Sequence, residues 1–191
     1  PSLLQGLSLF SKLGVVPQRL VLFPFEHEFG EQLLNGEYQP GDYNSDLVYM
    51  KAVKLIADGS IQGYTGYLSH PYHTPFHGDA DYRGYPAIPR EELFAKVAAL
   101  HKAGYQLAIH GNGDASIEDI LDAFEAAQQA YPVADPRMIL IHSQMARRDQ
   151  VARMKALGVT PSFFTAHTYY WGDRHRDIFM GPERAAVISP G

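Results

Sequence analysis

Three segments of the sequence share one pattern: a helical stretch, a lysine in its last turn, a glycine, and then a short apolar run. The helical stretches span residues 3–13, 89–103 and 147–157, and they stop at Gly14, Gly104 and Gly158. Glycine adopts the left-handed conformation that ends a helix at little cost, and lysine offsets the negative end of the helix dipole. This alternation of helices and apolar strands is typical of parallel α/β folds.

The apolar runs predict five strands, at residues 19–25, 51–57, 105–110, 137–142 and 159–164. A further helix is expected to begin near Ser116, whose hydroxyl can cap it. The intervals between strands are irregular, which excludes a short solenoid repeat. Five strands are too few to close an eight-stranded barrel, so the chain is expected to be either an open sheet or a fragment of something larger.

Two long segments interrupt the pattern of helices and strands within a single domain spanning residues 1–191. Residues 60–89 are dense in glycine, proline and tyrosine, and residues 165–181 form a second long segment. Loops of this length are usually functional, so both are expected at the rim where the strands end.

Composition narrows the class of protein. The 191 residues are 46% hydrophobic and 19% charged, with a net charge of −5, as in an ordinary globular domain. The lack of a basic patch argues against nucleic acid or an anionic membrane as partner. The chain has no cysteine, which excludes disulfides and thiolate ligands. No apolar run is long enough to cross a bilayer, and a cytoplasmic location is expected.

Two histidines end neighbouring apolar runs of the predicted sheet. His110 closes the run that begins at Tyr105, and His142 closes the run that begins at Met138. Because the carboxyl ends of parallel strands form one rim, the two imidazoles are expected to lie near each other. Neutral imidazole is a common ligand of zinc and other transition metals. The glycine-rich segment after His110 could instead cradle phosphate, but it lacks the P-loop pattern, so the metal interpretation is preferred.

Lys54 is the third candidate, because it lies within the apolar run Ala52–Ala57. A protonated amine cannot bind a metal, whereas a lysine that has reacted with carbon dioxide carries a carboxylate that can. The alternative is a buried ion pair between Lys54 and Asp58. Two histidines alone leave a catalytic zinc site incomplete, because such a site usually has three protein ligands.

Other residues are expected to support the site or line it. Asp114 is expected to support His110 or to begin the following helix, and Asp58 to contact the ligands or the substrate. The last run is followed by His167, Tyr169, Tyr170, Trp171 and His175, which predict a substrate wall at the rim. A rival metal site would combine His110 with three histidines of the long loop, which are His70, His73 and His77.

Three motifs in this order resemble the amidohydrolase superfamily, in the branch that includes N-substituted formamide deformylase. They are Val53-Lys-Leu-Ile-Ala-Asp-Gly-Ser60, Ile109-His-Gly-Asn-Gly-Asp114 and Ile141-His-Ser-Gln144. The resemblance implies a (β/α)8 barrel with a divalent metal, most often zinc, at the carboxyl ends of its strands. It also implies that Lys54 is a carbamylated bridging ligand and that His110 and His142 are further metal ligands.

The sequence departs from this family at several positions. It has no His-x-His pair, and it ends before the aspartate that would activate water, so no catalytic base is assigned. Ile141 stands where glutamate is frequent, and Gly111-Asn112 replaces a more apolar pair. The chain is therefore expected to be a partial TIM-type barrel, covering about strands three to seven and lacking the first and last strands.

The function that these residues predict is metal-dependent hydrolysis of a C–N bond in a small, non-peptide amide. The isolated chain is expected to be inactive, because ligands are missing. Exposed strand edges of an incomplete barrel could lead to homo-oligomers. The alternative is a non-catalytic α/β module that binds a small ligand. A serine hydrolase is not supported, because the sequence has no Gly-x-Ser-x-Gly elbow.

Overall fold

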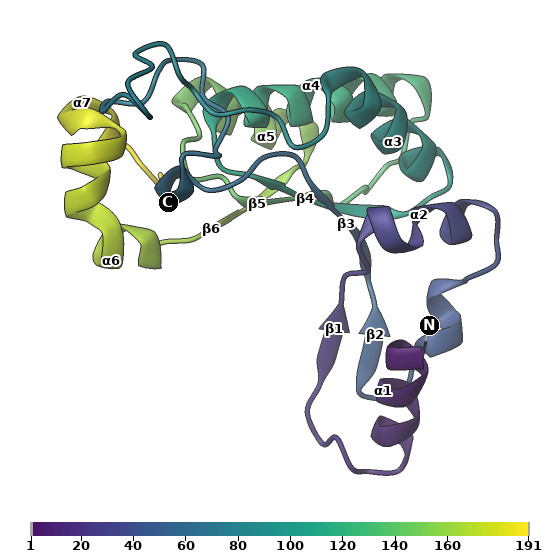
Figure 1. Cartoon of the computed structure of the whole chain (residues 1–191). Helices are drawn as coiled ribbons and strands as arrows, with labels where there is room; N and C mark the ends of the chain where they lie inside the picture. Colours follow the sequence, from purple (N-terminus) through teal and green to yellow (C-terminus); the bar gives the residue numbers. More distant parts are fainter. Residues whose placement is uncertain (1, 191) are drawn as a thin grey trace.

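The computed structural model describes residues 2–190 and shows six short strands joined mainly by helices (Figure 1). The strands are β1 (Leu20–Leu22), β2 (Val48–Met50), β3 (Ala52–Ile56), β4 (Gln106–Gly111), β5 (Ile139–His142) and β6 (Thr160–Phe163). The helices are α1 (Ser2–Lys12), α2 (Glu26–Leu34), α3 (Arg90–Lys102), α4 (Asp114–Ala130), α5 (Arg148–Leu157), α6 (Ala166–Arg174) and α7 (Gly181–Ala185).

The strands form two parallel sheets, as the alternating pattern of the sequence predicts. The larger sheet has the order β3-β4-β5-β6, and the smaller sheet pairs β1 with β2. In the larger sheet each strand lies beside the next one along the chain, and a helix connects each pair. The mixed α/β class with parallel strands is therefore confirmed.

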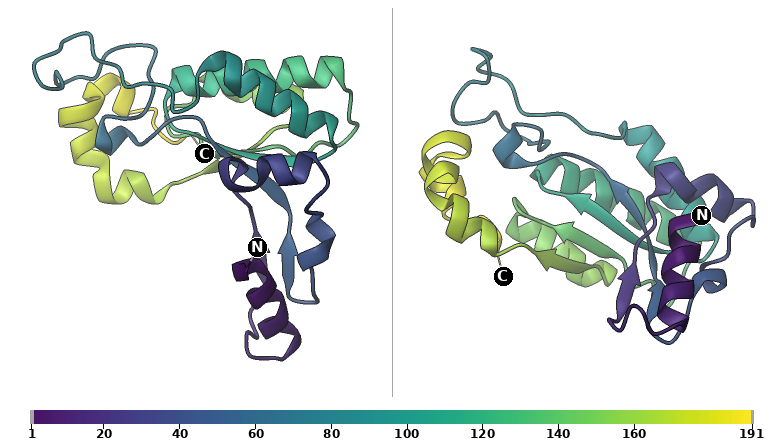
Figure 2. Two further views of the ribbon diagram at one scale, coloured as in Figure 1. Left: turned by 45° about the vertical axis from the view of Figure 1, so that its right-hand side comes forward. Right: turned by 60° about the horizontal axis from the view of Figure 1, so that its bottom comes forward.

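The hydrophobic core lies between the larger sheet and the layer of α3, α4 and α5 on one face of it (Figure 1). Alternate strand residues reach this core, among them Val53 and Leu55 of β3, Leu107 and Ile109 of β4, and Leu140 of β5. The right view of Figure 2 brings the opposite face forward, with the strands in front of these helices. That opposite face receives the remaining strand residues, because successive side chains of a strand alternate between faces.

Residues 165–181, expected to be a loop, are largely helical. They contain α6, a π-helical turn (His175–Phe179) and the start of α7. Residues 166–171 contain no glycine or proline to break a helix, and the run of aromatic side chains hides the helical period. This correction turns the expected second rim loop into a helical arm beyond β6 (Figure 1).

Three further details of the structure differ from what the sequence predicts. α2 was not predicted, although Glu26 and Glu28 in its first turn favour a helix start. The run expected as one strand from residue 51 begins at Ala52, with β2 directly before it. α4 begins at Asp114 rather than near Ser116, so Ser116 lies inside the helix, and its buried hydroxyl has no hydrogen-bond partner among the described residues.

Residues 64–89 contain no helix or strand in the described structure, but aromatic side chains pack part of this segment. The rings of Tyr64, Tyr72, Phe76 and Tyr82 lie against one another, and Tyr64 also contacts Phe179. At Gly113 a Cβ atom would lie 1.8 Å from the carbonyl oxygen of Tyr67, so only glycine allows the two segments to approach this closely. The loop is thereby fixed against the β4–α4 turn.

Within residues 2–190 no helix combines the length and apolar character that a membrane crossing requires.

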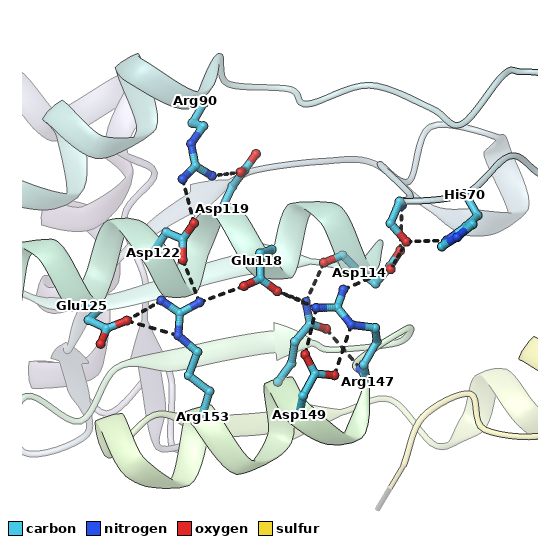
Figure 3. A network of polar contacts seen from close by, with 12 residues as sticks. His70, Arg90, Asp114, Glu118, Asp119, Asp122, Glu125, Arg147, Asp149 and Arg153 are labelled. Atoms are coloured by element: carbon cyan, nitrogen blue, oxygen red, sulfur yellow. Dashed lines mark hydrogen bonds and ion pairs between the residues drawn. The ribbon is translucent and has the colours of Figure 1, made fainter.

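Charged side chains tie α3, α4 and α5 together on the outside of the helical layer (Figure 3). Arg153 of α5 pairs with three carboxylates of α4, which are Glu118, Asp122 and Glu125. Arg90 of α3 pairs with Asp119 and Asp122. Shared partners make this a network, and networks contribute more than isolated surface pairs.

Replacing Arg153 with methionine should lower the free energy of unfolding by about 1–2 kcal/mol, because three neighbouring carboxylates lose their counter-charge. Urea denaturation followed by circular dichroism measures the change. Arg148→Met is the matched control: Arg148 is exposed on the same helix, and its loss should change stability by less than about 0.5 kcal/mol. Equal effects of the two substitutions would contradict a stabilising role for the network.

Candidate functional site

Lys54 and His110 lie on the face of the sheet opposite the helical layer. The register pairs Lys54 with Ala108 and Ile56 with His110, so His110 is two residues nearer the carboxyl ends of the strands than Lys54. Their strand neighbours Val53, Leu55 and Ile109 point into the core. The alternation of strand side chains therefore places the lysine and the histidine on the same side.

His142 reaches the same site through an unusual backbone. Leu140 faces the core, so regular alternation would also direct His142 toward the helices. Instead, His142 and Ser143 both have positive φ angles, of 73° and 47°, in the left-handed region that non-glycine residues seldom adopt. The imidazole rings of His142 and His110 lie 4.7 Å apart, centroid to centroid.

The sheet holds this conformation in place. The Ser143 amide donates to the carbonyl of Gly111 (3.0 Å), and the Ser143 hydroxyl donates to the carbonyl of Leu140 (3.1 Å). Left-handed backbone at non-glycine residues costs free energy, and such residues cluster at functional sites. Lys54, His110 and His142 are together called the histidine site below.

Burial keeps both imidazoles of the histidine site neutral. Burial, together with the nearby charges of His110, Lys54 and His167, lowers the pKa of His142 to about 4. The pKa of His110 is also lowered, mainly by burial, although a hydrogen bond to the carbonyl of Gly59 opposes the shift. Near neutral pH each ring therefore keeps a lone pair, which a metal ligand requires.

The orientation of His110 is fixed by the chain after β3. Its Nε2 donates to the carbonyl oxygen of Gly59 (2.9 Å), which leaves the lone pair on Nδ1. Metal-binding histidines commonly donate their other ring N–H to a carbonyl or carboxylate in this way. The Asn112 amide donates to the same carbonyl (2.7 Å).

Asp58 has a role that the sequence did not predict. Its side chain is fully buried and accepts backbone N–H groups of Tyr67 (2.9 Å), Asn112 (2.9 Å) and Gly113 (2.8 Å). Burial raises the pKa of Asp58 to about 7, and these three hydrogen bonds oppose the rise. Its Oδ1 lies 3.6 Å from Nε2 of His110. Asp58 thus joins three segments beneath the histidine site.

The ion pair considered between Lys54 and Asp58 does not form. Among the described residues Lys54 makes no ion pair, and its amine is half-buried on the open face. Burial lowers the pKa of Lys54 to about 8. A larger fraction of this amine is therefore uncharged at neutral pH than for an ordinary lysine.

Some side chains of the aromatic segment after β6 lie at the histidine site, and others are exposed to solvent. The His167 ring lies 6.1 Å from His142 and 6.3 Å from His175. His175, which is fully buried, is 3.0 Å from the Gln144 amide through Nε2, and burial lowers its pKa to about 4. Tyr170 is 74% exposed, and Trp171 stacks with Arg174 rather than with a histidine. His167 therefore lies at the site, whereas nothing in the structure brings Tyr170 or Trp171 to it.

Gln144 and His175 belong to the surroundings of the site, and of the two only Gln144 was not among the residues that the sequence placed at the rim. The only sequence signal for Gln144 is its position two residues after His142. His175 lies in the segment expected to be a loop, and its burial follows from the π-helical turn.

Asp114 and the loop histidines lie away from the histidine site. Asp114 accepts hydrogen bonds from the amide and hydroxyl of Ser69 and from Arg147 (Figure 3). His70 contacts Ser69, and the amide of His73 donates to the carbonyl of Phe179. Within residues 2–190 no three His, Asp or Glu side chains converge as a metal-binding set, so the rival site of His70, His73 and His77 with His110 is not formed.

The histidine site nevertheless fits part of a metal site. Two neutral rings lie close together, one of them is oriented by a backbone carbonyl, and a half-buried lysine lies on the same face. These are two imidazole rings with a chemistry that suits a metal ion, and one amine that would need modification to bind a cation.

Comparison with known proteins identifies the family of the chain. A sequence model of the amidohydrolase family matches residues 17–190. The chain is 28% identical over 136 residues to Protein LONG AFTER FAR-RED 3 of Arabidopsis thaliana, covering 71% of this chain and 23% of that protein. It is 30% identical over 125 residues to the Putative amidohydrolase YtcJ of Bacillus subtilis, covering 63% and 22%.

Solved structures are similar in fold. A crystal structure of an uncharacterized metal-dependent hydrolase from Pyrococcus furiosus matches with a TM-score of 0.78 and 23% identity, over 96% of this chain and 36% of that one. A second, from Pyrococcus horikoshii, matches with a TM-score of 0.69 and 23% identity, over 92% and 35%.

The chain spans about a quarter of the curated relatives and about a third of the solved structures that it matches. The resemblance to the amidohydrolase superfamily is confirmed, while the formamide deformylase branch stays a prediction. Because the family match covers most of the sequence, the chain belongs to the amidohydrolase family.

Proposed function

We propose that this chain is the metal-binding sector of a hydrolase that cleaves C–N bonds in small, non-peptide amides, formamides included. The observation that carries the proposal is the approach of His110 and His142 to 4.7 Å on the face that also bears Lys54. Membership of the amidohydrolase family supports the C–N bond as the target.

The fold that we propose for the intact enzyme is a (β/α)8 barrel, of which β3 to β6 form consecutive strands. Their parallel, sequential order and the helical layer on one face support this. The face that carries the histidine site would then be the interior of the barrel. The substrate would approach from the rim formed by the carboxyl ends of the strands.

In this proposal Nδ1 of His110 and a ring nitrogen of His142 bind a divalent cation, with zinc expected because imidazole suits it. When bound, the cation supplies Lewis acidity, which polarises a carbonyl group and lowers the pKa of water. Gly59 holds His110 in the tautomer that frees Nδ1. His167 lies beside His142 and would contact the substrate or shield the site from solvent.

The same residues explain why we expect the isolated chain to be inactive. Asp58 is the carboxylate nearest to His110, but its oxygens already accept three backbone N–H groups. It is therefore poorly placed to take a proton from water. Among residues 2–190 no other aspartate or glutamate joins the two histidines in a metal-binding set.

Zinc binding should depend on both histidines. After incubation with zinc and gel filtration, elemental analysis of the 191-residue chain is expected to find bound metal. The double variant His110→Ala/His142→Ala should bind at least tenfold less, because it lacks both imidazoles. His27→Ala is the matched control, since His27 is exposed in the first turn of α2, and it should bind as much as the unaltered chain. Equal zinc in all three proteins would overturn the proposed ligands.

Lys54 should form a carbamate with carbon dioxide in its uncharged form. The amine nitrogen would bond to carbon and release a proton, so the yield should rise with pH. Burial lowers the pKa of Lys54 to about 8, so the rise should be centred near pH 8 rather than near the ordinary value of 10.5.

Carbon-13 NMR in labelled bicarbonate measures this modification. A carbamate resonance is expected that grows through pH 8 and is absent from Lys54→Met. Lys51→Met is the control, because Lys51 is exposed beside the same strand, and it should retain the resonance. A resonance that survives in Lys54→Met would show that another amine reacts.

A further inference from the structure

A cavity of about 610 Å³ lies between the loop after β3, the start of α4, the turn after β5, and α7. Its apolar lining includes Leu68, Met145 and Met180, which are buried, and Val187 at the exposed edge. None of Lys54, His110 and His142 lines it. Its size is that of sites for small organic molecules.

Arg184 is the cationic side chain of this cavity that is available to a ligand. Its Nε donates to the carbonyl of Met180 (2.8 Å), and its terminal nitrogens donate to the carbonyls of His70 (3.4 Å) and Pro71 (2.8 Å). In the described part of the chain Arg184 makes no ion pair. Three of its five N–H groups are used, so one remains on each terminal nitrogen.

The other charges around the cavity are already balanced or exposed. Arg147 is neutralised by Asp114, Glu118 and Asp149 (Figure 3). Asp114 uses both oxygens for Ser69 and Arg147. Glu183 is exposed, where water screens its charge. Arg184, half-buried against an apolar wall, therefore has no carboxylate in direct contact among the described residues, and it interacts with the charge of Asp114 only at longer range.

Ser69 and His70 form a polar edge to the same cavity. The Ser69 hydroxyl donates to Asp114 and lies 2.9 Å from Nδ1 of His70 (Figure 3). In a serine hydrolase the carboxylate contacts the histidine, whereas here it contacts the serine. This arrangement suits positioning of a ligand and does not activate the serine for attack.

We propose that this cavity is a second binding site, separate from the histidine site, for a small organic carboxylate. The carboxylate pairs with the free N–H groups of Arg184, whose planar fork matches its geometry. The apolar body of the ligand packs against Leu68, Met145 and Met180, where the flexible methionines adapt to its shape.

Fluorine-19 NMR titration with 4-fluorobenzoate tests the site on the 191-residue chain. Saturable binding is expected, and the neutral analogue 4-fluorobenzyl alcohol should bind at least tenfold more weakly. Arg184→Gln should weaken binding of the benzoate about tenfold, which corresponds to about 1.4 kcal/mol. Arg148→Gln is the matched control, because it removes an exposed charge of α5 next to Arg147 and should leave the affinity unchanged.

Because Arg184 also holds loop carbonyls, Val187→Trp provides a second test. Val187 is 55% exposed, so a larger side chain can be accommodated by the fold while it fills the cavity. This variant should also weaken benzoate binding at least tenfold. Absence of saturable binding, or an equal loss in Arg148→Gln, would overturn the proposal.

The His110→Ala/His142→Ala variant separates this proposal from the proposed hydrolase. It should lose zinc but keep its affinity for 4-fluorobenzoate. Loss of benzoate binding in that variant would place the carboxylate at the histidine site and overturn the second site.

Discussion

The arrangement of the site depends on the hydrogen bonds that the carboxylate of Asp58 accepts. Asp58 lies two residues after β3, and it accepts backbone N–H groups from the long loop at Tyr67 and from the β4–α4 turn at Asn112 and Gly113. A buried carboxylate is costly unless its oxygens are hydrogen-bonded, and here three donors meet that requirement. The same contacts place Gly59 against His110, so the positions of the loop and the β4–α4 turn and the orientation of the His110 ring depend on one group.

Much of the sheet could be predicted from the sequence because its signals are local. Gly104 and Gly158 end helices, and the apolar runs after them become β4 and β6. That His110 and His142 end neighbouring strands at one edge of the sheet followed from a general property of parallel strands, whose carboxyl ends share one edge. These predictions needed only the chain order and the period of the apolar residues.

The remainder depended on contacts between distant segments. The direction of His142 comes from two left-handed residues, which alternation alone would have predicted wrongly. The role of Asp58 requires Tyr67 and Gly113 to meet across the loop, a contact without a local signature. The helical arm after β6 was missed because its aromatic residues suggested a binding loop, although no residue in 166–171 breaks a helix.

The left-handed backbone at His142 and Ser143 lowers stability, but it places the imidazole of His142 in the site. Glycine at either position would relieve the conformational cost, but at position 142 it would remove the imidazole from the site. At position 143 only a hydroxyl bonded to the carbonyl of Leu140 would be lost. The two neighbours are therefore under different constraints. A substitution by glycine that relaxes the turn is compatible with the site at position 143, but not at position 142.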